Sequence, residues 1–355
     1  MWRRFRRHRI ALACALFLPA LYLLSLLAPF FAPHGQTWRD ARFSYAPPMP
    51  PRWSPADGLH VHAVRQDIDP VTLRRDYVTD SSIRLPVGFF VSGEPYTLFG
   101  VIRSSRHFIG LDREACIEKG IDPDQYRWYL LGGDRLGHDV LSRLVHGSRV
   151  SLSIGLVAIA INFVLGLTLG GISGYVGGRV DNLVQRTIEI VNSFPQIPLW
   201  LAMAAVIPLH WSALETYFAI TVLLSLLTWT GLARVVRGKM LSLREEDYAT
   251  AARLIGVRHG RIIFRHLLPG MTSHIIVALT LSVPQMIIGE TALSFLGLGL
   301  RPPVTSWGVM LQDCLNMQVV SNYPWLLMPA VAITATVLAF NFLGDGLRDA
   351  ADPYG

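Results

Sequence analysis

The sequence predicts an all-α membrane protein that carries a small mixed lobe outside the membrane. Of its 355 residues 51% are hydrophobic and only 16% are charged, whereas a soluble domain carries about a quarter charged residues. Mean hydropathy is +0.38. The hydrophobic residues are gathered in long runs, and one polar segment, residues 32–149, separates the first run from the second. These observations exclude a soluble, disordered or fibrous chain.

Six apolar runs are long enough to cross a bilayer, which takes roughly 20 residues. They cover residues 10–31, 150–172, 187–208, 214–233, 272–298 and 325–343. Pro195 and Pro198 interrupt the third run, and Pro284 interrupts the fifth. Such helices either line a cavity or kink only to pack.

The runs divide the chain into three parts. These are a basic N-terminus with the first span (1–31), an outer lobe (32–149) and a five-helix core (150–355).

Basic residues predict the orientation of the spans. Five arginines precede the first run, so we expect a cytoplasmic N-terminus and an uncleaved anchor. Six crossings then place residues 173–186, 234–271 and the C-terminal 344–355 in the cytoplasm. Segment 234–271 carries eight Lys or Arg against three acidic residues, whereas the short outer loops hold one basic residue, Arg301. The loop charges therefore agree with the orientation that the first span predicts.

Residues 32–149 predict a lobe of mixed structure. Prolines cluster near its start, and β-like runs follow at Ile83–Val91 and Tyr96–Ile102. The lobe either caps the membrane core, or docks a soluble partner and shapes an entrance. Cys116 and Cys314 fall on the same outer side, so a disulfide between them is an open alternative.

The longest cytoplasmic loop predicts a helical hairpin. Ser242 and Glu245 have capping-box spacing, so we expect a helix to begin there. Gly256 suits its C-terminus, and a second helix over residues 258–268 is expected to end at Pro269. The apolar positions that share a face of the first helix are Tyr248, Ala251, Ala252 and Ile255.

A helix this short is marginal alone and needs a surface to lie on. One interpretation places it flat on anionic lipid headgroups. The other inserts it into a groove on a cytoplasmic protein, where the small alanines permit close approach.

This hairpin resembles the "EAA" loop of binding-protein-dependent ABC importer permeases. The family pattern is Glu-Ala-Ala, a Gly after three further residues, and a short apolar stretch that ends in Pro. This chain has Thr250-Ala251-Ala252, then Gly256, then His266-Leu267-Leu268-Pro269 at the same spacing. Thr250 replaces the family's Glu, which removes an acidic contact and keeps the hairpin geometry.

Further motifs narrow the resemblance to the second permease subunit of dipeptide and oligopeptide importers. The resemblance runs from about residue 130 to the C-terminus, and residues 35–130 exceed what most members carry. The motifs are Gly133–Arg143, Gly174–Gly178, Glu290–Gly299, Pro302–Gly308 and Asn341–Asp349.

The resemblance implies the type I ABC importer permease fold with six transmembrane helices in a bacterial inner membrane. The implied partners are a homologous second permease subunit, two cytoplasmic ATPase subunits and an extracytoplasmic solute-binding protein. Loop 234–271 would couple the ATPases to the spans. The implied coupling residues are Tyr248, Thr250, Ala251, Ala252, Gly256 and Pro269.

The chain is not expected to hydrolyse ATP. A phosphate-binding loop needs Gly-Lys followed by Ser or Thr, but the only lysines are Lys119 and Lys239, and Met240 follows the latter. We expect no catalytic site, cofactor, metal site or nucleic-acid partner. One group of residues has side chains of the kinds that bind metals, namely Asp134, His138 and Asp139. A helix-capping or inter-subunit polar network is the better interpretation of this group.

Polar residues within the spans are candidates for the transport pathway, because a charge at membrane depth is costly. Asn192 and Gln196 flank Pro195, and Glu290 lies near the outer end of the fifth span. Each has a structural alternative, namely hydrogen bonds between helices or an internal partner for the carboxylate.

Other functions remain to be weighed. The same machine could carry nickel, an antimicrobial peptide or a glycoside. A proton-coupled carrier would show internal repeats and buried ionisable groups at mid-membrane. A membrane enzyme would need a nucleophile–base pair or a metal cluster, and a receptor would need a large cytoplasmic signalling domain. The sequence favours none of these three.

Overall fold

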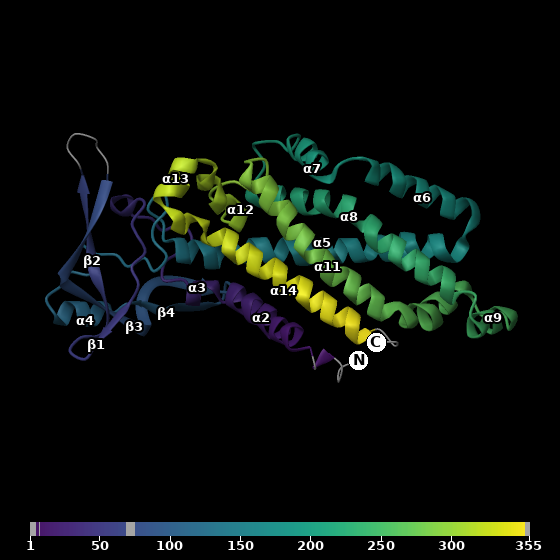
Figure 1. Cartoon of the computed structure of the whole chain (residues 1–355), viewed down its shortest axis with the longest axis horizontal. Helices are drawn as coiled ribbons and strands as arrows, with labels where there is room; N and C mark the ends of the chain where they lie inside the picture. Colours follow the sequence, from purple (N-terminus) through teal and green to yellow (C-terminus); the bar gives the residue numbers. More distant parts are fainter. Residues whose placement is uncertain (1–4, 7, 69–74, 352–355) are drawn as a thin grey trace. The chain divides into compact units, whose positions relative to one another are not determined.

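The computed structural model describes residues 5–6, 8–68 and 75–351 of the chain (Figure 1). It divides into two compact units. One comprises residues 1–20, 151–300 and 333–355, and the other comprises residues 21–150 and 301–332. The first is helical, and the second contains the β-strands.

The helical unit is built from long helices joined by shorter ones. They are α2 (Arg9–Leu26), α5 (Val140–Val176), α6 (Gly178–Ser193), α7 (Gln196–Ala204), α8 (Ala213–Leu243), α9 (Asp247–Leu254), α10 (His259–Arg261), α11 (Leu268–Phe295) and α14 (Met328–Ala351), some of which extend into the other unit. A π-helical turn, Ile262–Leu267, joins α10 to α11. Glycines let α5 approach α8: a Cβ on Gly170 would lie 2.4 Å from the Ala233 carbonyl oxygen. Close backbone approach through small residues is the usual packing between membrane helices.

Five helices of the described residues are long and apolar enough to cross a membrane. They are Arg9–Leu26, Val140–Val176, Ala213–Leu243, His259–Phe295 and Pro324–Ala351. These correspond to five of the six predicted spans.

The predicted span 187–208, which Pro195 and Pro198 interrupt in the sequence, is divided between two helices. Phe194 is extended (ψ 140°) between α6 and α7, because a residue that precedes proline is pushed out of the helical region. With nine residues, α7 is too short to span alone.

The other unit contains an antiparallel sheet in the order β1-β2-β3-β4. The strands are β1 (Arg52–Ser54), β2 (Gly58–Ile68), β3 (Arg75–Leu98) and β4 (Ile102–Leu111). Short helices complete the unit: α3 (Ala28–Phe31), α4 (Arg113–Glu118), α12 (Trp307–Met310) and α13 (Met317–Asn322), with 3-10 turns at Ala41–Phe43, Leu311–Leu315 and Pro324–Leu327. A core that includes Phe43, Leu85, Trp128 and Tyr129 lies beside the sheet.

The predicted β-run Ile83–Val91 lies within β3, as expected. The run Tyr96–Ile102 is not a single strand, because a turn at Phe99 and Gly100 separates β3 from β4. Cys116 and Cys314 are both free, so the possible disulfide does not form in this structure.

The motif before α5 is a capping network. Asp134 accepts hydrogen bonds from the backbone of Leu136 and His138, and from the side chains of His138 and Arg143. Burial raises the pKa of Asp134, but the His138 hydrogen bond and the Arg143 charge outweigh it, so the pKa lies below its usual value. Asp139 caps α5 by accepting from the Ser142 backbone N–H at 3.1 Å. This agrees with the interpretation of a polar network.

Candidate functional site

The candidate coupling site is the elbow formed by α9, α10 and the π turn. It does not begin with the predicted capping box, because Ser242 lies inside α8, which continues to Leu243. The N-cap of α9 is Glu246, without a side-chain cap. A capping box does occur at the other end of α8, where Ser212 and Glu215 cap each other.

A Schellman motif ends α9. Gly256 has φ +77°, as the sequence predicts for a helix C-terminus. Its N–H donates to the Arg253 carbonyl at 3.0 Å, and the Val257 N–H donates to the Ala252 carbonyl at 3.1 Å. The turn thereby satisfies two carbonyls at the end of α9 and reverses the chain.

The predicted shared face of α9 is divided in the structure. Ala252 is buried together with Ala249, in a cluster with residues of α8 and α11 such as Met240 and Met271. Thr250 and Ala251 are exposed. Tyr248 is also exposed, so only the alanine side of α9 faces the molecule.

Beyond the buried alanines, α9 presents apolar side chains to solvent. Leu254 and Ile255 are 82% and 79% exposed, and Phe264 on the π turn is also exposed. Sequence reasoning included Ile255 but missed Leu254 and Phe264, although the apolar character of Leu254 beside Ile255 and Gly256 was a usable signal. Two adjacent exposed apolar side chains, Leu254 and Ile255 at the tip of the elbow, indicate an interaction surface.

Pro269 does not end a helix, contrary to the sequence prediction. It lies in the first turn of α11, and the helical path is continuous from His259 to Phe295. The π turn before it replaces the usual bonding, since the Leu268 N–H donates to the Ile263 carbonyl five residues back. Proline is tolerated where the helical pattern is already interrupted.

Polar contacts hold the base of the elbow. Arg244 donates to the Gly174 carbonyl at 3.0 Å, and the Tyr175 hydroxyl lies 2.7 Å from Nδ1 of His259. Arg237 binds Asp181 through two contacts of 2.6 Å. The hydrogen bond from Arg237 lowers the pKa of Asp181 to about 2.

The three pathway candidates lie on three different helices. Glu290 is fully buried on α11, accepts from Ser294 Oγ at 2.8 Å and lies 3.4 Å from Ser151 Oγ on α5. Asn192 on α6 accepts from Thr230 Oγ1 on α8 at 3.1 Å. Gln196 is exposed at the start of α7.

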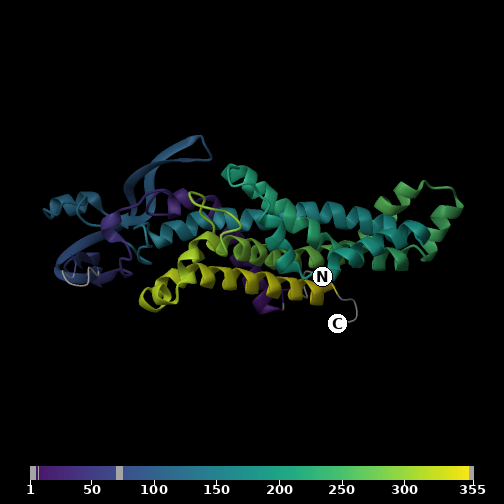
Figure 2. The ribbon, with the colours of Figure 1, turned by 90° about the horizontal axis from the view of Figure 1, so that it is seen from above.

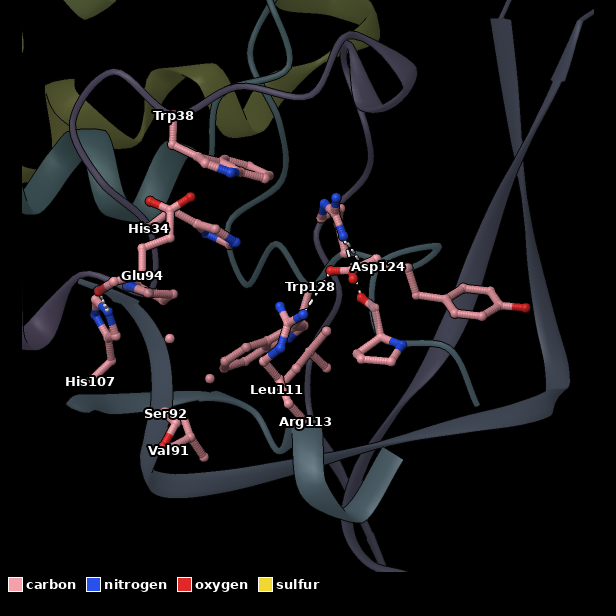
Figure 3. A pocket seen from close by; sticks show the side chains of 16 residues that line it. His34, Trp38, Val91, Ser92, Glu94, His107, Leu111, Arg113, Asp124 and Trp128 are labelled. Atoms are coloured by element: carbon pink, nitrogen blue, oxygen red, sulfur yellow. Dashed lines mark hydrogen bonds and ion pairs between the residues drawn. The ribbon is translucent and has the colours of Figure 1, made fainter. Parts of the chain in front are cut away.

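The lobe holds a cleft of about 200 Å³ (Figure 3). His34 and Trp38 stack on one side, with ring centroids 4.1 Å apart, and Glu94 lies beside them. Arg113 lies on another wall and binds Asp124 at 2.7 Å, which lowers the pKa of that carboxyl. The cleft therefore presents both charge signs and aromatic rings to solvent.

Two family descriptions match the chain. "Binding-protein-dependent transport system inner membrane component" matches residues 166–354, and "N-terminal TM domain of oligopeptide transport permease C" matches residues 1–48. The first covers the elbow, Glu290 and all of α6 to α14. The chain belongs to the binding-protein-dependent transport system inner membrane component family. Neither match includes residues 49–165, where the four strands lie.

Curated relatives of this transport family include several peptide permeases. The dipeptide transport system permease protein DppC of Bacillus subtilis is 41% identical over 242 residues, which is 68% of this chain and 73% of the relative. The oligopeptide transport system permease protein OppC of Haemophilus influenzae is 41% identical over 65% of this chain and 72% of its own length. The glutathione transport system permease protein GsiD of Pectobacterium atrosepticum is 38% identical over 65% of this chain and 74% of its own length. These relatives confirm the predicted resemblance to peptide importer permeases.

Proposed function

We propose that the chain is a permease subunit of an ABC importer that moves dipeptides or oligopeptides into the cytoplasm. The names of the relatives at 41% identity support this cargo class. The observation that carries the proposal is the elbow, whose tip exposes Leu254 and Ile255 beside the Gly256 turn. An uptake assay with labelled dipeptide, against nickel, an antimicrobial peptide and a glycoside as competitors, tests the cargo.

The proposed topology has six crossings with both termini in the cytoplasm and the lobe outside. Five crossings are the long apolar helices, and residues 187–208, from the second half of α6 through α7, form the sixth around the break at Phe194. An irregular backbone at membrane depth is tolerated where it lines a cavity or is covered by protein. This principle supports Asn192 and Gln196, which flank the break, as pathway residues.

The contacts of Glu290 support a structural role more than a place in the pathway. Its carboxylate is enclosed by serine hydroxyls from α5 and α11. These contacts support a role in holding the two helices together, while contact with solute remains the alternative for an acidic group within a span.

The elbow is the proposed docking point for one of two ATPase subunits. The alanine side of α9 packs on α8 and α11, while Leu254 and Ile255 face outward. A short helix with an apolar exposed side suits insertion into a groove. In this proposal the ATPase subunits transmit the energy of ATP hydrolysis to the spans through the elbow. A second permease subunit completes the pathway, and a solute-binding protein delivers cargo on the outer side. The isolated chain is expected to show no ATP turnover.

Introducing charge at the tip tests this function. Leu254→Asp with Ile255→Asp should abolish co-purification of the ATPase subunits and peptide uptake, because charges cannot enter an apolar groove cheaply. Leu209→Asp, equally exposed but outside the elbow, is the control and should retain both. If the double variant still binds the ATPases, the elbow is not their docking site; if the tip lies on lipid instead, the double variant should also weaken contact of the elbow with vesicle lipid in the absence of the ATPase subunits.

A further inference from the structure

The β3–β4 hairpin extends beyond the rest of the sheet. The first half of β3 pairs with β2 as far as Pro86, and the second half pairs with β4 from Val87 to Leu98. Beyond the register shift that follows Ser92, the ribbon consists of two strands with exposed or half-buried side chains. It projects as an arm in Figure 2. A two-stranded hairpin is marginally stable alone in water, so it needs a surface to lie on.

The tip of this hairpin is apolar where a polar turn is usual. Phe99 and Gly100 have φ of +53° and +72°, and the Val101 N–H donates to the Leu98 carbonyl at 3.1 Å. Such turns favour Asn or Asp at the first position, since a bulky residue is disfavoured at positive φ. Phe99, Val101 and Ile102 are 57%, 81% and 57% exposed.

The base of the hairpin carries an aromatic cluster, defined as Phe30, Phe31, Phe89, Phe90 and Phe108. The Phe108 ring lies 5.6 and 5.8 Å from Phe89 and Phe90, and 6.0 and 5.3 Å from Phe30 and Phe31. Phe89 and Phe90 are each 58% exposed, and Phe90 has φ +57°.

The aromatic cluster is continuous with a candidate membrane span. Phe30 and Phe31 belong to α3, which follows α2 after one residue. Residues at the end of a span lie at the boundary between headgroups and acyl chains, where aromatic side chains are enriched. The rings packed on Phe30 and Phe31 therefore lie at or near the same boundary.

The charge of the hairpin fits an anionic lipid surface. From Pro95 to Leu111 there is no Asp or Glu, while Arg103 and Arg106 are exposed. Arginine beside exposed apolar side chains is typical of segments that lie in the membrane interface. A soluble acidic protein would also match the charge, but it would not account for the continuity with α2.

We propose that the β3–β4 hairpin is a membrane-contacting arm, whose exposed phenylalanines and Phe99–Ile102 tip enter the interface of the outer leaflet. This inference rests on the proposed topology, in which α2 crosses the membrane and the lobe lies outside. The arm fixes the lobe at the membrane surface and provides the surface that a two-stranded ribbon lacks.

Fluorescence quenching by brominated lipids tests the arm. In a background with its three cysteines replaced, single cysteines at Val101 and at the exposed control Val78 carry a nitrobenzoxadiazole label. The importer complex, without its solute-binding protein, is reconstituted in phosphatidylcholine and phosphatidylglycerol vesicles. We expect brominated lipid to quench position 101 at least twofold more strongly than position 78. Phe99→Asp should lower the quenching at 101 to the control level.

Three results would overturn the proposal. They are equal lipid quenching at positions 101 and 78, efficient quenching of position 101 by aqueous iodide, and protection of position 101 from both quenchers, which would show a protein covering the tip. A membrane-impermeant thiol reagent separates these results from a failure of the topology, because position 78 should react only from outside. Reaction of 78 only from inside would refute the topology itself, whatever the lipid quenching shows.

Discussion

Replacing Gly256 by valine isolates the role of the turn that ends α9. Its φ of +77° lies in the left-handed region, which costs about 1–2 kcal/mol for a residue with a Cβ. No atom lies within 4 Å of the Cβ that would be added, so the cost comes from the backbone and not from a clash. A cost of this size changes the ratio of intact to distorted elbow by about 5–30-fold.

The assay compares peptide uptake and co-purification of the ATPase subunits at matched membrane levels of the variants. Gly256→Val should lower both by about fivefold or more. Gly256→Asn should retain most activity, because Asn tolerates positive φ. Gly260→Val is the matched control, since its Cβ also enters open space at an ordinary φ. Uptake by Gly256→Val equal to that of Gly260→Val would refute the link between the turn and coupling.

Three further changes test the packing. Gly170→Ala should lower the melting temperature in detergent, because the new Cβ meets backbone of α8 at 2.4 Å, whereas Gly171→Ala, with 3.9 Å to its nearest atom, should leave it unchanged. The ion pair of Asp181 stabilises the fold above the ordinary carboxyl pKa of 3.8 and is lost as pH falls toward about 2; Asp181→Asn should remove that part of the pH dependence of melting, and an unchanged profile would contradict it. Glu290→Ala should destabilise by about 1–3 kcal/mol and Glu290→Gln by less; equal melting temperatures would count against the structural role.

Features that depend on residues close together in the sequence were predictable. Apolar runs of sufficient length gave five spans, and a glycine at a helix end gave the left-handed turn at Gly256. Capping-box spacing misled at Ser242, since the same residues also occur inside a helix and α8 continues past them. Pro269 misled for a related reason: a preceding π turn lets a helix continue through proline.

Features that depend on distant contacts were not predictable from spacing. The side of α9 that is buried depends on where α8 and α11 lie, so Ala249 joined the core while Ile255 stayed exposed. The aromatic cluster unites residues separated by more than fifty positions. Glu290 could be placed near a span end from sequence, but its serine partners on two helices could not.

The π turn between α10 and α11 has a mechanical consequence. A π turn accommodates one residue more than the α turn it replaces, and one residue of an α-helix corresponds to a rotation of about 100° and a rise of 1.5 Å. Tightening Ile262–Leu267 to α geometry would therefore swivel α9 about the axis of α11 and shift it along that axis by little more than an atomic radius. The geometry of this one turn therefore sets the angle at which α9 leaves α11 far more than its position along the axis.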